Sequence, residues 1–247
     1  MGSEGAAADR LLSWDRVSLV IGLLLLIVGH YQGLFVAPAE AMMGDVGRIL
    51  YVHVPTAWAC MLVYTACFVF AGLALWSGKG KWDAAMEASA EVGVLYNALL
   101  LIQGSLWARP TWGVFWTWDP RLTTSAIVLV LFVGVLVLRR VITEPERRLN
   151  LGSIAAVLAY AGVPIVYFSV KWWRTLHQPF SSPATVSDSF ITPLRLAAFG
   201  MIFLGIGLIG LRWRALRREV ERELSAPALP AALPTLQLGE RGPGGAS

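Results

Sequence analysis

Two histidines and a tryptophan-rich run are the residues of this chain that could act together on a ligand. His53 lies in "YVHVPTAW" and His177 in "KWWRTLHQP", and the run "WGVFWTWD", Trp112 to Asp119, lies between them in the sequence. Imidazole is a common ligand of haem iron, and an indole ring offers a broad apolar face to a flat macrocycle. Two imidazoles beside an aromatic surface would therefore suit a metalloporphyrin.

Basic side chains near these residues could pair with the two propionates of such a macrocycle. Arginine suits carboxylates because its planar guanidinium donates two parallel hydrogen bonds. The candidates are Arg48, Arg109, Arg121, Lys171 and Arg174.

Each of these residues also has a plainer interpretation. A histidine at a membrane interface is often only an amphipathic anchor, and Trp172 and Trp173 could belong to an ordinary aromatic belt. His30, in "VGHYQG", is interpreted as an interfacial or packing residue. Asp119 could cap the next helix, because Pro120 disfavours a helix before it. The residues alone leave both interpretations open.

The composition places these residues in a membrane protein. Of 247 residues, 56% are hydrophobic and 15% charged, and the mean hydropathy is +0.62. A bilayer core takes roughly 20 apolar residues per helix. Six stretches have this length, at about 17–36, 54–76, 90–108, 122–138, 151–170 and 191–211. We therefore predict an all-α integral membrane protein with six transmembrane helices.

The six spans leave no room for a second folded domain. We predict a cytoplasmic N-terminal segment over 1–16, a transmembrane domain over 17–211, and a cytoplasmic basic extension with a disordered tail over 212–247. From Ser225 the chain is rich in Pro, Ala and Gly, a composition typical of disorder. The first 16 residues lack the pattern of a cleaved leader.

The distribution of positive charge predicts the orientation. The ends and even-numbered loops hold 14 of the 20 Lys and Arg residues. Cytoplasmic loops carry such an excess, so both termini are predicted to be cytoplasmic. Both histidines and the tryptophan run then lie on the outer side. The sequence pI of about 9.3 follows from this topology and does not indicate nucleic acid.

Tryptophan is concentrated on that outer side. An aromatic belt would place it at both interfaces, yet six of the eleven lie in or beside the outer loops: Trp107, Trp112, Trp116, Trp118, Trp172 and Trp173. Because Pro110 suits the first position of a helix, we predict a short interfacial helix in the loop over 109–123. A strand would also align Trp112, Trp116 and Trp118, at period two.

Three stretches carry a resemblance to a known family. The run "WGVFWTWDPRLT" (112–123) resembles the WWD signature of membrane haem-handling proteins and fills every fixed position of W-G-x-x-W-x-W-D-x-R-L-T. "GRILYVHVPTAW" (47–58) and "YFSVKWWRTLHQP" (167–179) narrow the match. With six spans, the chain resembles the haem exporter protein C family of cytochrome c maturation over about 16–214.

The resemblance implies a function and a set of site residues. Such proteins bind haem b transiently on the periplasmic side of the bacterial inner membrane, with His53 and His177 at the axial ligand positions. The haem platform maps onto Trp112, Gly113, Trp116, Trp118 and Asp119. The implied partners are an ABC-type ATPase subunit, a second membrane permease subunit, a small single-span subunit and a periplasmic haem chaperone.

We therefore expect a haem-binding and haem-transfer subunit that is not itself an enzyme, with ATP hydrolysis in a partner. Three alternatives stay open. A membrane electron-transfer cytochrome usually buries its histidines within the bilayer, whereas these two lie at span ends. A component of a cytochrome c haem lyase would need a recognisable site for a CxxCH peptide. A small-molecule permease would need broken helices at the midplane, for which Gly162–Pro164 is the one candidate.

Overall fold

The computed structural model describes residues 13–177 and 188–225. Its elements are α2 (Trp14–Tyr31), a π-helical turn η1 (Gln32–Val36), a 3₁₀ turn η2 (Asp45–Ile49), α3 (Leu50–Ser77), α4 (Gly80–Trp112), α5 (Pro120–Val141), α6 (Pro145–Tyr160), α7 (Gly162–Trp172) and α8 (Asp188–Ser225). Six segments are long and apolar enough to cross a membrane. The prediction of an all-α, six-span membrane protein is confirmed. The predicted disordered tail after Ser225 lies outside the described residues.

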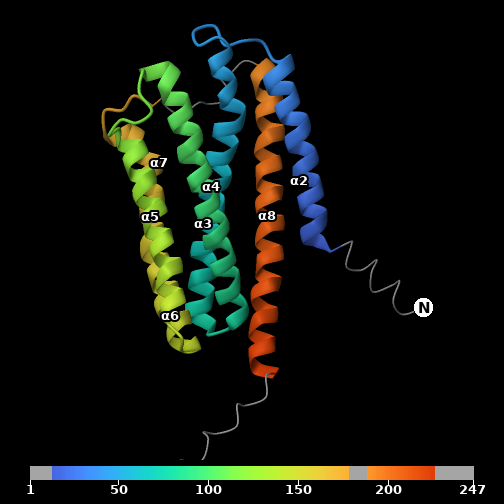
Figure 1. Cartoon of the computed structure of the whole chain (residues 1–247), viewed down its shortest axis with the longest axis vertical. Helices are drawn as coiled ribbons and strands as arrows, with labels where there is room; N and C mark the ends of the chain where they lie inside the picture. Colours follow the sequence, from blue (N-terminus) through green and yellow to red (C-terminus); the bar gives the residue numbers. More distant parts are fainter. Residues whose placement is uncertain (1–12, 178–187, 226–247) are drawn as a thin grey trace, which may run out of the picture.

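The helices run up and down an elongated bundle (Figure 1). The first residue of α2 and the last of α8 lie toward the same end, at the bottom of the view. The connections after η1 and after α4 lie at the other end. We call this other end, formed by residues 37–49, 113–119 and 173–177, the site end. The described parts of the first, third and fifth connections, which are predicted to be outer loops, therefore share one end of the bundle.

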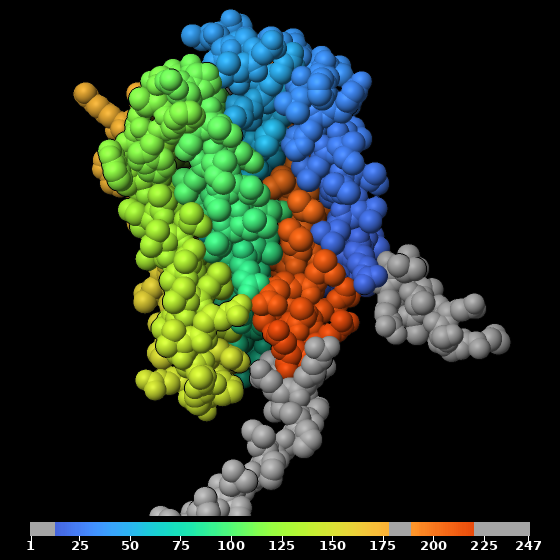
Figure 2. All heavy atoms as spheres, in the orientation of Figure 1, coloured from blue at the N-terminus to red at the C-terminus, as the bar shows by residue number. Residues whose placement is uncertain are grey.

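The first and last spans form a close pair. Glycines let the two backbones approach: a Cβ on Gly22 would lie 2.6 Å from the Leu204 nitrogen, and one on Gly207 would lie 2.7 Å from the Asp15 oxygen. Small residues commonly serve this purpose between membrane helices. Ser18 also donates a 2.7 Å hydrogen bond to the Phe203 carbonyl. In the space-filling view α8 extends beyond α2 at the lower end (Figure 2).

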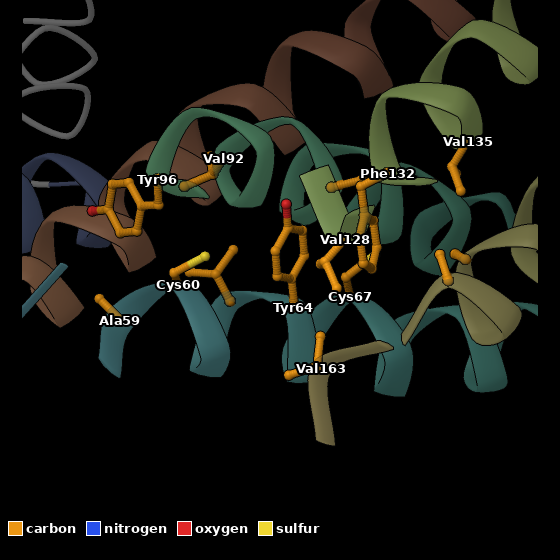
Figure 3. Close-up of a cluster of buried hydrophobic side chains, with 14 of the residues drawn as sticks. Ala59, Cys60, Tyr64, Cys67, Val92, Tyr96, Val128, Phe132, Val135 and Val163 are labelled. Carbon is orange, nitrogen blue, oxygen red and sulfur yellow. The ribbon is translucent and has the colours of Figure 1, made fainter. Parts of the chain in front are cut away.

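The core lies among α3, α4, α5 and α6. Tyr64 of α3 stacks on Phe132 of α5 with ring centres 3.9 Å apart, and both side chains are fully buried (Figure 3). At the end opposite the site, buried Arg139 of α5 pairs with Asp83 at 2.7 Å and with Glu87 at 2.6 Å, both on α4. These ion pairs join α4 and α5 far from the site end.

The fifth span is broken into two helices. Proline has no N–H, so Pro164 cannot donate to the carbonyl four residues earlier, and α6 ends at that residue, Tyr160. Gly162 lets the break approach α5, because a Cβ there would lie 2.7 Å from Val128 Cγ2. In these fully described helices, α6 packs along α3, whereas α7 packs along α5 and not along α3. The span therefore separates from α3 in its site-end half.

The tryptophan loop differs from the prediction. The structure contains no separate helix beginning at Pro110, because Pro110 lies in the last turns of α4. Gly113 ends that helix with φ of 82°, and residues 113–119 form an irregular segment. Pro110 removes only the hydrogen bond to the Leu106 carbonyl, and α4 continues for just two residues beyond it.

Candidate functional site

A cavity of about 510 Å³ lies inside the site-end half of the bundle. Side chains of α3, α4, α5 and α7 line it, together with Met43 from the segment before η2 and with Leu176 and His177 from the segment after α7. Its deepest polar residues are Tyr64 and Asn97. The volume is in the usual range for a small-molecule or cofactor site, about 300–1,000 Å³.

The two predicted histidines meet at this cavity. His53 lies in the first turn of α3 and is 8% exposed, and its ring centre lies 6.4 Å from that of His177. Aromatic rings flank the pair: Trp107 packs edge-on against His53 at 5.6 Å, and Trp112 against His177 at 5.9 Å. Residues 124 positions apart in the sequence are thus in contact.

The imidazole nitrogens of this pair are available to a metal. Among the described residues, His53 Nδ1 and His177 Nδ1 are buried and have no hydrogen-bond partner. Two imidazole rings on opposite sides of one metal ion, each bound through a nitrogen at about 2.0–2.1 Å, have ring centres roughly 6–6.5 Å apart. The observed 6.4 Å fits one iron atom between the rings. The residues present therefore fit a haem that is held by both.

Asp119 holds the segment that carries His177. Its Oδ1 accepts a hydrogen bond from the Arg121 N–H at 2.9 Å and so caps α5, one of the two roles that the sequence left open. Its Oδ2 accepts from Thr175 Oγ1 at 2.6 Å and from the Leu176 N–H at 2.8 Å. Burial alone would raise the pKa of Asp119, but these hydrogen bonds lower it below its usual value. A charged carboxylate therefore links the tryptophan loop to the histidine.

The surroundings of His177 keep it neutral. Burial first, and then the positive charge of Arg121, lower the pKa of His177 from 6.5 to about 4, although Asp119 acts in the opposite direction. The ring is therefore uncharged at pH 7. A neutral imidazole is the form that binds a metal.

Of the five predicted cations, Arg121 lines the cavity. The other four lie away from it. Arg48 donates to the carbonyls of Gly33 and Ala37 and pairs with Asp45. Arg109 donates to the Gly113 carbonyl, Lys171 lies 5.9 Å from the Phe168 ring, and Arg174 is exposed.

The tryptophan run divides into an inner and an outer part. Trp112 lines the cavity, whereas Trp116 and Trp118 do not. These two rings pack edge-to-face with centres 6.0 Å apart, and Trp118 is 83% exposed. Val114 and Phe115 beside them are exposed as well. One indole therefore faces the ligand space, and two form the rim outside it.

Sequence reasoning missed part of α4. Asn97, Gly104, Trp107 and Thr111 all line the cavity. Their spacing of seven, three and four residues keeps them on one helical face. Gly104 leaves room for His53, because a Cβ there would lie 3.3 Å from His53 Cε1. The sequence shows this shared face only if one helix is assumed to continue through Pro110.

Known proteins of similar sequence indicate a family for this chain. The family model described as "Heme exporter protein C" matches residues 5–226. The protein of that name from Bradyrhizobium diazoefficiens is 35% identical over 222 residues, which are 87% of this chain and 82% of the relative. The one from Escherichia coli K12 is 36% identical over 216 residues, 85% of each chain. A mitochondrial protein of Marchantia polymorpha named for cytochrome c biosynthesis is 32% identical over 197 residues, 78% of this chain and 84% of the relative.

Proposed function

The chain belongs to the Heme exporter protein C family, and on that premise we propose that it binds haem between His53 and His177 and passes it on during the biogenesis of c-type cytochromes. The observation that carries this proposal is the pair of buried imidazoles, 6.4 Å apart, at a cavity of suitable size. Each ring keeps a nitrogen that no described protein group occupies.

The other site residues have separate roles in the proposal. Trp112 offers its ring to the macrocycle beside His177, and Arg121 pairs with a propionate. Asp119 and Gly113 hold the loop in shape, through hydrogen bonds and through a turn that needs positive φ. Trp116 and Trp118 form the rim that the receiving protein meets.

The cellular setting completes the proposal. The chain acts in the bacterial inner membrane with the site end on the periplasmic side, and it binds haem b transiently. It presents the haem to a periplasmic haem chaperone. An ABC-type ATPase subunit, a second membrane permease subunit and a small single-span subunit complete the export complex. ATP hydrolysis belongs to the ATPase subunit, so this chain is a haem-handling subunit and not a catalyst.

Absorption spectra of the purified protein with added haem test the proposal. We expect the six-coordinate, low-spin spectrum that two histidine ligands give. His53→Ala and His177→Ala should each lose that spectrum or retain far less haem. His30→Ala is the matched control, because His30 is half-buried at the same end and does not line the cavity. Unchanged spectra in both ligand variants would overturn the assignment.

A further inference from the structure

The cavity also reaches the side of the bundle. Four helices surround it, and three of the four seams between them are packed: α3 with α4, α4 with α5, and α5 with α7. The fourth seam, between α7 and α3, is not closely packed in these fully described helices, because the break at Pro164 directs α7 onto α5. The cavity therefore has an open side between α3 and α7.

Two aromatic residues mark this side opening. Trp58 of α3 and Tyr167 of α7 both line the cavity, yet they are 41% and 39% exposed. A side chain that faces both a cavity and the exterior lies at the mouth of that cavity. The opening therefore has an aromatic ring on each side.

The opening lies at the depth of the bilayer. Both residues belong to segments apolar enough to cross a membrane. Tyr167 lies five residues before the last residue of α7, which is about 8 Å along a helix. Trp58 lies five residues after His53, on the side of the histidine pair away from the site end. The opening therefore faces the leaflet nearest the site end.

The lining of the opening is mainly apolar. It consists of Val54, Trp58 and Met61 on α3, and of Val163, Val166 and Tyr167 on α7. None of these side chains is charged, whereas Arg121 and Thr111 line the cavity nearer the site end. A ligand that enters from the side must therefore be largely apolar and flat enough to pass two aromatic rings.

We infer that this opening is the route by which haem reaches the histidines, directly from the hydrocarbon layer of the adjoining leaflet. The inference rests on the proposed function. Haem is a flat apolar macrocycle with charge at one edge only, so it dissolves in lipid with its propionates toward the headgroups. Sliding between Trp58 and Tyr167 keeps the ring in an apolar environment and brings its iron to His53 and His177.

Blocking the opening tests the route. Tyr167→Cys and Trp58→Cys proteins in lipid vesicles are labelled with a bulky, lipid-soluble maleimide. Haem is then supplied from a second population of vesicles that contain it in their bilayer. We expect labelling of either cysteine to slow the appearance of the low-spin spectrum at least several-fold. Each labelled variant is compared with its own unlabelled form, which carries the same substitution.

Ile165→Cys is the matched control. Ile165 lies two residues from Tyr167 on the same helix, is also 39% exposed, and does not line the cavity. The natural protein treated with the maleimide controls for Cys60 and Cys67, which are both buried. Labelled Ile165→Cys should load normally.

The outcomes separate the route from the function. Normal loading of both labelled opening variants would overturn the route and leave haem binding intact. Equal slowing of labelled Ile165→Cys would also overturn it, because bulk anywhere on α7 would then be the cause. Absence of the low-spin spectrum in the natural protein would instead reject the proposed function.

Discussion

Asp119 forms hydrogen bonds both with the start of α5 and with the segment before His177. Three donors converge on its carboxylate, one from the start of α5 and two from the segment before His177. Hydrogen bonds to a charged group contribute about 1.5–3 kcal/mol each. The position of His177 therefore depends on a residue that does not line the cavity.

Replacing Asp119 with Ala should weaken haem binding without removing a ligand. Loss of a group that orients a metal ligand typically costs about 10- to 100-fold in affinity, and we expect that range for haem titrated into the purified protein. Thr175→Val should have a smaller effect, because the Leu176 N–H still reaches the carboxylate. Equal affinity of Asp119→Ala and the natural protein would contradict this role.

Trp112 and Trp118 should behave differently, although they belong to one sequence run. Trp112 contacts His177 and lines the cavity, so Trp112→Ala should lower haem affinity. Trp118 is 83% exposed, so Trp118→Ala should leave haem affinity nearly unchanged and lower the yield of haem-loaded chaperone. The measurements are haem titration and chaperone loading per amount of inserted protein. Equal losses of haem affinity in Trp112→Ala and Trp118→Ala would reject the division of the tryptophan run into an inner and an outer part.

The residue types at the site were predictable from sequence, whereas their roles depended on the folded geometry. Two outer histidines and a tryptophan run indicate a flat ligand with an iron. The link from Asp119 to Thr175 joins positions 56 apart, and no local pattern encodes it. Arg48 was a candidate partner for a propionate because it lies near His53 in the sequence. In the fold its guanidinium donates instead to the carbonyls of Gly33 and Ala37, which the sequence does not show.

At the scale of elements, apolar length predicted all six spans but not their full extent. The third span was expected to begin near residue 90, yet α4 begins at Gly80. Asp83 and Glu87 ended the apolar run in sequence, but in the fold both are paired with Arg139 of α5. Charged residues can continue a helix when their partner comes from another element, which a single sequence does not show.

Because α2 packs closely against α8, we expect leucine substitutions at two glycines, Gly207 and Gly134, to differ strongly in their effect on stability. Gly207→Leu should destabilise the protein by about 1–3 kcal/mol, because the new side chain would press on Leu19 and on the backbone at Asp15. Gly134→Leu should be well tolerated, since nothing lies within 4 Å of a Cβ there. Thermal unfolding in detergent would compare the two. Equal melting temperatures would mean that α2 moves away at little cost.

At the scale of the whole molecule, the charge distribution predicts which end of the bundle faces outward. Met42, 93% exposed at the site end, and Lys79, exposed at the opposite end, are suitable positions for a cysteine. In intact spheroplasts a membrane-impermeant maleimide should label Met42→Cys and not Lys79→Cys. Cys60 and Cys67 are buried and should give little background. The reverse labelling would invert the orientation of the site.

The packing of the first span against the last affects the order in which the bundle can assemble during synthesis. At a synthesis rate of about 5–20 residues per second, the stretch from Tyr31 to Asp188 takes roughly 8–31 s to translate. During that interval the main helical partner of α2 does not yet exist. The glycine face of α2 and Asp15, which later pairs with Arg214, then meet only lipid or the insertion machinery. Because α2 packs mainly against α8, α2 reaches its final position in the bundle only after α8 has been made.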